Sequence, residues 1–148
     1  MRKAPAPQTV KNAAAEQLSR LIVQGMLEKK AQDIVVLDLR QVKNAVADFF
    51  VLCSGTSDTQ LDAISDSIEE TVYKARRENP WQREGKLGKE WILLDYGDCV
   101  VHIFKKNRRQ FYGLEQLWGD APMTFIDDNG QESLTPIVPV AVGPQGMQ

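Results

Sequence analysis

The chain has 148 residues, of which 43% are hydrophobic and 26% charged, so it can bury the core of one domain. Its net charge of −2 and its pI near 5.4 argue against a protein whose main partner is bare nucleic acid, because such proteins usually carry a basic excess. A basic protein partner is compatible with this charge. No apolar run reaches the roughly 18 residues of a membrane span, and the N-terminal MRKAPAPQTV lacks the apolar segment of a secretory signal.

The two cysteines, Cys53 and Cys99, both lie in apolar, strand-like runs. Such cysteines are typical of small buried hydrophobic side chains rather than of a disulfide, which favours a reducing compartment. Together with the missing span and signal, this predicts a cytoplasmic protein that does not enter a membrane.

The first third of the chain predicts a helix and a buried strand after a flexible N-terminus, residues 1–8. Apolar side chains recur at three- and four-residue spacing from Thr9, which predicts an amphipathic helix that ends near Lys29 and Lys30. The members of this stripe are Ala14, Leu18, Leu21, Ile22, Gly25 and Met26. The aliphatic run Ile34–Leu37 then predicts a strand that is covered on both faces.

A second central strand, Phe49–Cys53, runs directly into the sequence SGTS and a long helix. Ser57 followed by Gln60 is typical of a capping box at the start of that helix. Small residues before a helix can also cradle a phosphate. The loop lacks the Gly-Lys-Ser/Thr of a P-loop, and acids begin the helix, so we favour a turn and cap over a phosphate site.

The stretch Trp91–Trp118 is dense in aromatic residues and predicts a hairpin followed by a helix. Trp91–Asp95 reads as a strand, Tyr96–Asp98 as a tight turn, and Cys99–Phe104 as a strand whose side chains alternate between two faces. Cys99, Val101 and Ile103 would face one way, and Val100, His102 and Phe104 the other. A short edge strand near Trp81 and Arg83 precedes the hairpin, and Gly119 would end the helix. The aromatic residues exceed what a core needs, which indicates a binding surface.

The candidate catalytic groups form no convincing active site. Cys99 and His102 have a spacing found among metal ligands, but residues three apart on a strand point to opposite faces, and no second pair completes a zinc site. The same geometry argues against a Cys–His nucleophile, so we interpret His102 as a structural residue. Asp95 and Asp98 could hold magnesium or could simply be turn residues. We therefore expect a protein without catalytic activity, metal or cofactor.

Four segments in this order resemble the Iojap (DUF143) family, the ribosomal silencing factors: ADFFVLCSGTS, AISDSIEE, EWILLDYGDCVVHIF and RRQFYGLEQLWGDAP. The resemblance covers residues 9–122, and we expect residues 123–148 to form an extended or disordered tail. It implies an α/β fold: a single domain in which helices flank a mixed β-sheet of about five strands. It also implies a topology related to nucleotidyltransferases but without their catalytic acids.

The resemblance further implies a binding protein rather than an enzyme. Members of the family bind the large ribosomal subunit through ribosomal protein fourteen at the intersubunit face and block joining of the small subunit, which lowers translation when nutrients are scarce. They tend to be homodimers when free. We therefore expect no small-molecule substrate. The alternatives are an assembly factor for the large subunit and a nucleotide-dependent transferase that uses SGTS with Asp95 and Asp98.

On this interpretation, aromatic and acidic residues of the Trp91–Trp118 stretch contact the ribosomal protein, and the adjacent cations contact ribosomal RNA phosphates. The expected desolvated anchors are Trp91, Leu93 and Tyr96, and the expected charge partners are Asp95, Asp98 and Glu115. Tyr112, Leu117 and Trp118 would be divided between the core and the interface. The candidate RNA contacts are Lys105, Lys106, Arg108 and Arg109.

Overall fold

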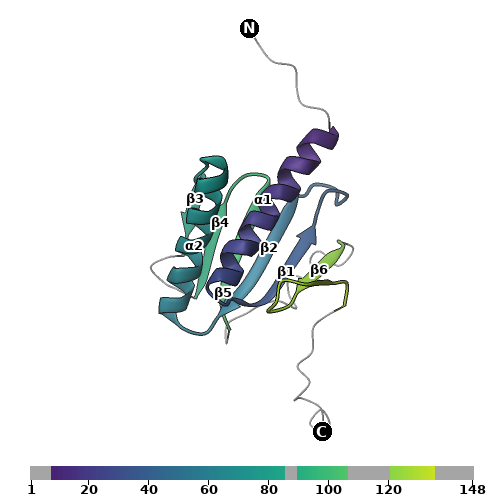
Figure 1. The fold of residues 1–148 in the computed structure, drawn as a ribbon. Coiled ribbons are helices and arrows are strands. Elements are labelled where there is room, and N and C mark those ends of the chain that lie inside the picture. The colour runs from purple at the N-terminus through teal and green to yellow at the C-terminus, as the bar shows by residue number, and fades with distance from the viewer. Residues whose placement is uncertain (1–7, 86–89, 107–120, 136–148) are drawn as a thin grey trace.

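The computed structural model describes residues 8–85, 90–106 and 121–135, which form one α/β unit: a twisted sheet with two helices packed on the same face (Figure 1). This confirms the predicted fold class. The elements in chain order are α1 (Gln8–Glu28), β1 (Gln32–Asp38), β2 (Phe49–Gly55), α2 (Asp58–Arg76), β3 (Gln82–Glu84), β4 (Trp91–Asp95), β5 (Cys99–Lys105), β6 (Met123–Ile126) and β7 (Glu132–Ser133).

The sheet has the strand order β3-β4-β5-β2-β1-β6-β7, in which β2 and β5 are parallel and all other neighbours are antiparallel. The expectation of a mixed sheet is therefore confirmed, but the expected number of about five strands is wrong, because the described residues form seven. The two unexpected strands are β6 and β7. They are four and two residues long, too short for a periodic pattern to reveal them.

Strand β6 also corrects the predicted boundary at Pro122. Residues after this proline enter the sheet, since Ile126 lies opposite Ile34 and Met123 opposite Leu37 on β1. Phe125 and Ile126 are buried there. The sequence suggested a tail because prolines and glycines punctuate it, but β1 supplies a complete row of backbone hydrogen-bonding groups for the short segment. Residues 136–148 of the predicted tail lie outside the described part.

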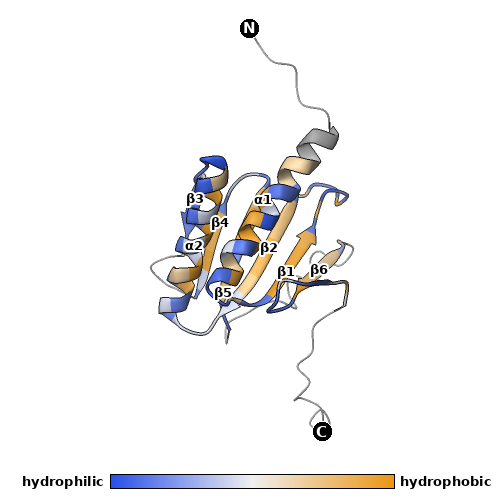
Figure 2. Cartoon of the chain, viewed as in Figure 1, coloured by the Kyte–Doolittle hydropathy of each residue, from blue (hydrophilic) through white to orange (hydrophobic). Residues whose placement is uncertain are grey.

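The two helices bury one stripe each against the sheet and pack closely on one another. Buried residues of α1 include Leu18, Ile22 and Met26, as the spacing predicts. A Cβ placed on Gly25 would lie 2.7 Å from the Ile68 Cα of α2, so the helices approach at a position that only glycine fits. Figure 2 shows the apolar strands behind helices with polar outer faces. Neither helix in the described segments is apolar over enough of its length to cross a bilayer.

Each face of the sheet carries its own apolar cluster. The helix face, beneath α1 and α2, includes Ile92, Leu94, Val101 and Ile103 among its buried residues. The second face, on the opposite side, carries another set of buried side chains: Val35, Leu37, Leu39, Ala47, Phe50, Leu52, Val100, Phe104, Ala121 and Phe125. The alternation predicted for Cys99–Phe104 is thereby confirmed.

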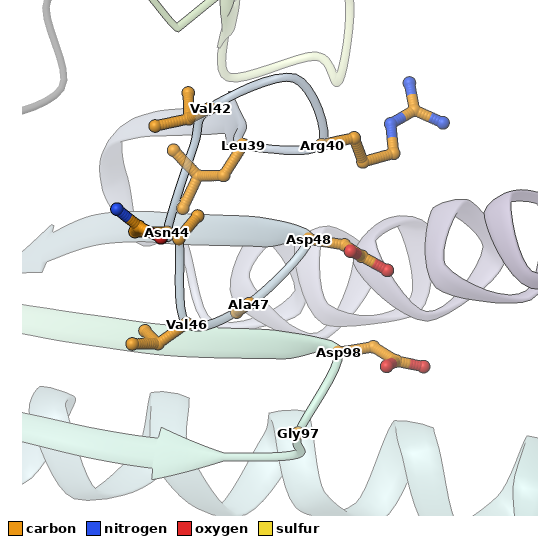
Figure 3. A pocket seen from close by; sticks show the side chains of 10 residues that line it. Leu39, Arg40, Val42, Asn44, Val46, Ala47, Asp48, Gly97 and Asp98 are labelled. Carbon is orange, nitrogen blue, oxygen red and sulfur yellow. The ribbon is translucent and has the colours of Figure 1, made fainter.

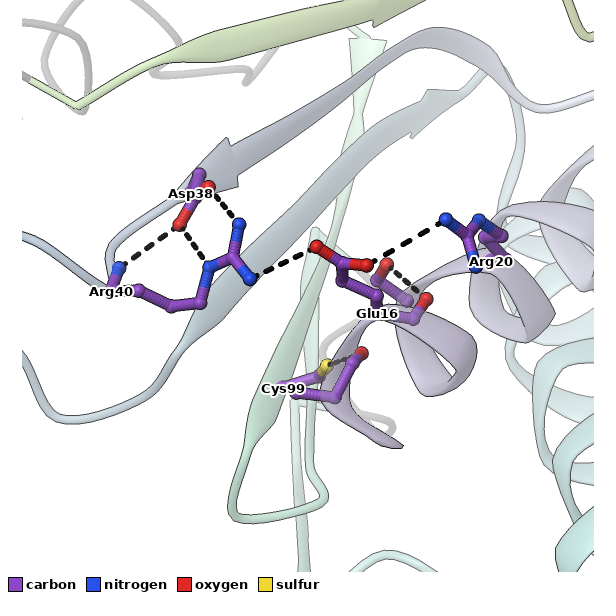
Figure 4. Close-up of polar contacts among 7 residues, drawn as sticks. Glu16, Arg20, Asp38, Arg40 and Cys99 are labelled. Atoms are coloured by element: carbon purple, nitrogen blue, oxygen red, sulfur yellow. Dashed lines mark hydrogen bonds and ion pairs between the residues drawn. The ribbon is translucent and has the colours of Figure 1, made fainter. Parts of the chain in front are cut away.

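A charged network anchors the connector between β1 and β2 to α1 (Figure 4). The Arg40 guanidinium donates to Asp38 Oδ2 at 2.6 Å and to Glu16 Oε2 at 2.9 Å, and it also lies 4.9 Å from the centre of the Phe49 ring. The hydrogen bond from Arg40 lowers the pKa of Asp38, although partial burial opposes the shift. This network fixes the start of the connector, whose other end meets the hairpin turn, since the Asp48 N–H donates to the Asp98 carbonyl at 2.8 Å.

Candidate partner-binding site

The predicted hairpin is present, and its turn is closed by hydrogen bonds of the expected kind. The Tyr96 N–H donates to the Cys99 carbonyl at 2.9 Å, and the Gly97 N–H donates to Asp95 Oδ1 at 2.8 Å. Gly97 has a φ of 88°, a conformation that L side chains adopt rarely. Asp95 is thus a turn residue, and Asp98 is exposed at the tip. The turn holds β4 and β5 in one register, with Leu93 opposite His102 and Trp91 opposite Phe104.

Four rings on the second face form an aromatic cluster, which we define as Phe50, Trp91, His102 and Phe104. The Trp91 ring stacks on Phe104 with 5.2 Å between ring centres, and the Phe50 ring lies 4.8 Å from His102. The Trp91 indole N–H donates to His102 Nδ1 at 3.1 Å. Trp91 remains 48% exposed, whereas His102 is only 5% exposed. The cluster therefore presents one large aromatic side chain to solvent on a rigid sheet.

Burial sets the protonation state of His102. Desolvation lowers the pKa of this imidazole to about 4, so the ring is neutral near pH 7. Because Nδ1 accepts the indole hydrogen bond, the single proton of the neutral ring resides on Nε2. This Nε2 is buried and has no hydrogen-bond partner among the described residues. A buried polar group without a partner costs about 1–3 kcal/mol, so His102 occupies this position at the expense of stability.

Trp91, Leu93 and Asp95 alternate with the buried residues of β4 and so share the second face. Leu93 is half-buried and packs against the second-face cluster. The exposed Asp98 follows at the turn. Trp91, Leu93 and Asp95 thus follow one face of β4 from the open end of the hairpin to the turn, where Asp98 lies. Trp91 is the most exposed apolar side chain among them.

Tyr96 is not the exposed anchor that the sequence suggested. Its side chain is only 5% exposed and belongs to the helix-face cluster with Ile92 and Leu94. Burial raises the pKa of the Tyr96 phenol well above its ordinary value, and its hydroxyl has no partner among the described residues. Tyr96 is buried because side chains alternate along the strand. Positions 92, 94 and 96 point to the helices, and positions 91, 93 and 95 point away from them.

Two of the four predicted RNA-contacting cations are described, and both pair within the protein. Lys105 forms an ion pair with Asp58 at the start of α2, and the Lys106 ammonium donates to Gln32 Oε1 at 2.8 Å. Lys106 also lies 3.4 Å from a carboxylate oxygen of Asp33. The remaining predicted site residues lie outside the described part, as does the helix predicted to carry most of them: Arg108, Arg109, Tyr112, Glu115, Leu117 and Trp118.

The SGTS loop is a helix cap, as the sequence predicts. Ser57 Oγ accepts from the Gln60 N–H at 3.1 Å, and Gln60 Oε1 accepts in return from the Thr56 N–H at 2.7 Å. The Gln60 amide nitrogen also donates to the carbonyls of Lys29 and Lys30 just after α1. The loop therefore joins the ends of two helices, and its polar groups are used within the fold.

A pocket of about 250 Å³ adjoins the hairpin turn (Figure 3). The connector Leu39–Asp48 lines most of it, and Gly97 and Asp98 complete it. Figure 3 shows the Asp48 and Asp98 carboxylates pointing to the same side from the starts of β2 and β5. The described residues of its lining include no histidine, cysteine, serine or threonine, so they supply no nucleophile–base pair for acyl transfer.

The Cys99 and His102 side chains lie on opposite faces of β5, as the spacing predicts. The Cys99 thiol donates to the Ala15 carbonyl at 3.5 Å, and burial raises the pKa of the thiol far above its usual value. A thiol in this state is inert. Among the described residues, no three histidine, cysteine or acidic side chains are grouped so that they could share a metal ion.

The sequence did not reveal two features around the hairpin. Trp81 is 77% exposed, yet its backbone N–H donates to the Asp95 carbonyl at 2.7 Å. Its ring covers the turn so closely that a Cβ on Gly97 would lie 2.8 Å from it. The second is His102, whose bond to Trp91 depends on the hairpin register. Aligning the two predicted strands about the turn would have placed Trp91 and His102 on one face. The sequence therefore held a signal for this contact.

The comparisons with known proteins agree with these motifs. The family model described as "Ribosomal silencing factor during starvation" matches residues 12–138. The chain is 38% identical to the ribosomal silencing factor RsfS of Halalkalibacterium halodurans over 112 residues, which are 76% of this chain and 94% of the relative. It is 43% identical to that of Bacillus subtilis over 104 residues, 68% of this chain and 83% of the relative.

More distant proteins and a solved structure extend the comparison. The chain is 30% identical to mouse "Mitochondrial assembly of ribosomal large subunit protein 1" over 100 residues, 66% of this chain and 43% of that protein. A crystal structure of a protein from Bacillus halodurans superposes with a TM-score of 0.62 at 34% identity, covering 70% of this chain and 94% of the other. The α/β architecture is therefore shared with this solved structure. The chain belongs to the family of ribosomal silencing factors.

Proposed function

We propose that this protein binds the large ribosomal subunit through ribosomal protein fourteen at the intersubunit face and thereby blocks joining of the small subunit. Membership of the silencing-factor family supports a regulatory role on the ribosome. In this mechanism the protein represses translation under nutrient limitation by occupancy alone. A rigid domain on the joining surface collides with the incoming subunit, so neither a cofactor nor a chemical step is needed.

The half-exposed Trp91 on the second face carries the proposal. Aromatic side chains held in place before binding are the usual centres of protein interfaces, because they bury a large area with little loss of conformational freedom. Leu93 extends the apolar patch. Asp95 and Asp98 give the turn of the hairpin a negative charge that complements the Lys and Arg side chains of a basic ribosomal protein.

The remaining features of the proposal come from the family resemblance. The exposed Lys106, with the cations that follow it, would contact ribosomal RNA phosphates around the protein interface. Tyr112, Glu115, Leu117 and Trp118 would enlarge the contact surface. We further propose a cytoplasmic homodimer in the free state. The nucleotidyltransferase-like topology implied by the resemblance remains a prediction.

The decisive experiment sediments the purified protein with isolated large subunits through sucrose and then adds small subunits. Co-sedimentation with the large subunit and loss of the joined-ribosome peak are expected. Trp91→Ala should lower large-subunit affinity at least tenfold, about 1.4 kcal/mol, while circular dichroism stays unchanged. Tyr73→Ala is the matched control, because Tyr73 is 42% exposed on α2, on the opposite side of the sheet. Equal binding by Trp91→Ala and wild type would remove Trp91 from the interface.

An assembly factor for the large subunit is the second candidate, because the mouse relative is named for assembly of that subunit. Such a factor would bind immature large-subunit particles more tightly than mature ones and would not prevent subunit joining. Comparing the two particle types in the sedimentation experiment separates these functions.

A nucleotide-dependent transferase is the third reading. It would require SGTS to hold phosphate groups, but Thr56, Ser57 and Gln60 already bond to one another within the cap. Calorimetry with nucleoside triphosphates and magnesium tests this reading, and binding heat abolished by Ser57→Ala would revive it.

A further inference from the structure

We propose that His102 is a positioning residue for partner binding: its Nδ1 holds the Trp91 indole in the orientation that the ribosomal partner recognises. This inference rests on the proposed function, because it assigns a role within the same surface. His102 itself is 5% exposed and therefore acts through Trp91 rather than by touching the partner.

The strand register makes the contact possible. Leu93 is directly opposite His102, so Trp91 is the diagonal neighbour of His102 on the same face. A large ring can span the distance between diagonal neighbours, and the Trp91 indole N–H donates to His102 Nδ1 at 3.1 Å. Stacking on Phe104, with 5.2 Å between ring centres, fixes the plane of the indole, while the hydrogen bond fixes its direction within that plane.

A side chain as exposed as Trp91 would otherwise sample several rotamers about its two side-chain torsions. Ordering it only upon binding would subtract from the affinity. The hydrogen bond and the stacking order the ring in the free protein, so the partner meets a preformed anchor. This reasoning predicts that losing the acceptor weakens binding even though every contact atom of Trp91 remains.

The surroundings of His102 show why folding alone does not explain a histidine here. The ring packs beside Phe50 and Phe104 in an apolar environment, and its Nε2 has no partner within the described segments. A phenylalanine would fill the same space without burying a polar group. The distinct property that histidine supplies is the acceptor at Nδ1, and the side chain that uses it is Trp91.

The test compares two substitutions at this position for binding to isolated large subunits. His102→Phe keeps the ring volume but removes the acceptor, and we expect affinity to fall about five- to tenfold, equal to about 1–1.4 kcal/mol, with no loss of resistance to urea. His102→Asn should retain most of the affinity, because its Oδ1 can take the place of Nδ1. Should His102→Phe fold poorly, Trp91→Phe deletes the donor instead and should show at least the same loss, because it also removes part of the contacting ring.

Two further measurements separate positioning from a general effect on structure. In a double-mutant cycle, His102→Phe should add no further loss of affinity to Trp91→Phe, because the hydrogen bond is already absent. In the free protein, nitrogen NMR should show His102 protonated on Nε2 alone. The indole N–H resonance, assigned by its loss in Trp91→Phe, should shift and exchange faster with solvent in His102→Phe.

The outcomes distinguish this inference from the proposed function. Weak binding by Trp91→Ala with unchanged binding by His102→Phe would reject the positioning role and leave the interface intact. Unchanged binding by both variants would reject the interface itself, and the positioning role with it. Additive losses in the double-mutant cycle would show that His102 affects binding independently of Trp91, which would also overturn the inference.

Discussion

At the scale of single residues, the two faces of β4 separate side chains that look alike in the sequence. Trp91 and Tyr96 are both amphipathic aromatic residues next to the hairpin, yet one is 48% and the other 5% exposed. The difference arises because they occupy positions of opposite parity on one extended segment. His102 lies on the neighbouring strand and on the same face of the sheet as Trp91. Its protonation state therefore affects the contact with the exposed Trp91 rather than the core beneath the helices.

His102 should make folding stability depend on pH. Its pKa is about 4 when folded and near 6.5 when unfolded, because burial disfavours the charged ring. Between these values the unfolded chain binds more protons, so stability rises with pH. The contribution is complete above about pH 6.5 and is lost as pH falls toward 4, by an amount on the order of 3 kcal/mol.

Urea unfolding of wild type and His102→Phe near pH 7 and near pH 4.5 checks this prediction. Carboxylates such as Asp38, whose pKa is lowered by Arg40, titrate in both proteins, so the comparison cancels them. Wild type should lose stability relative to the variant as the pH falls. A difference between the two proteins that does not change with pH would contradict a buried, neutral His102.

At the scale of elements, the crossing of α1 and α2 depends on small residues. The Ser67 hydroxyl donates to the Gly25 carbonyl at 2.8 Å in a buried position, which joins the helices across their closest approach. Nearby, Gln60 bonds to the carbonyls that follow α1, so a second contact fixes the start of α2. The helix pair thus supports β4 and β5 from the side opposite to Trp91.

Gly25→Ala should destabilise the protein although alanine is the better helix former. The new Cβ would lie 2.7 Å from the Ile68 Cα and 3.0 Å from its nitrogen, so the backbones must separate. Overpacking of this kind costs about 1–3 kcal/mol, against a gain of about 1 kcal/mol in helix propensity. We expect a net loss of up to about 2 kcal/mol in the free energy of unfolding, measured in urea. Gln24→Ala, on the exposed side of the same helix, is the control and should change stability by less than about 0.5 kcal/mol.

At the scale of the whole molecule, the chain returns after β5 to complete the sheet at its far side. Strand β6 pairs with β1, and the Pro122 carbonyl accepts from the Asp38 N–H at 2.9 Å. Phe125 adds to the second-face cluster and Ile126 to the helix-face cluster. One short strand therefore contributes to both cores and covers the edge that β1 would otherwise expose.

Truncation experiments should reflect this closure. A chain that ends at Pro122 loses β6 and leaves β1 as an unpaired edge, so we expect lower stability and aggregation. A chain that ends at Thr135 keeps both strands and should unfold in urea as the full chain does. Size-exclusion chromatography and urea unfolding of the two truncations check the prediction. Full stability after truncation at Pro122 would show that β6 is dispensable.

Periodicity and capping signals in the sequence determined the local structure and the family. The stripe of α1, the Ser57–Gln60 cap and the alternation of β5 are properties of neighbouring residues, so the sequence alone predicts them. The ordered motifs around the hairpin likewise indicated a ribosomal silencing factor. Trp91, Leu93, Asp95 and Asp98 were identified as candidate contacts because apolar and aromatic residues usually anchor interfaces and acids can pair with a basic partner.

Contacts between distant segments were decided only by the tertiary structure. Strands β6 and β7 are too short for a periodic pattern to reveal them; β6 pairs with the edge of β1, and β7 pairs with β6. Burial of Tyr96 depends on which face the helices cover, and the bond between Trp91 and His102 depends on the hairpin register. Residue identities specify which hydrogen bonds can form and which side chains can be buried, but pairing across the sheet selects among them, because each such contact requires residues of different segments to meet.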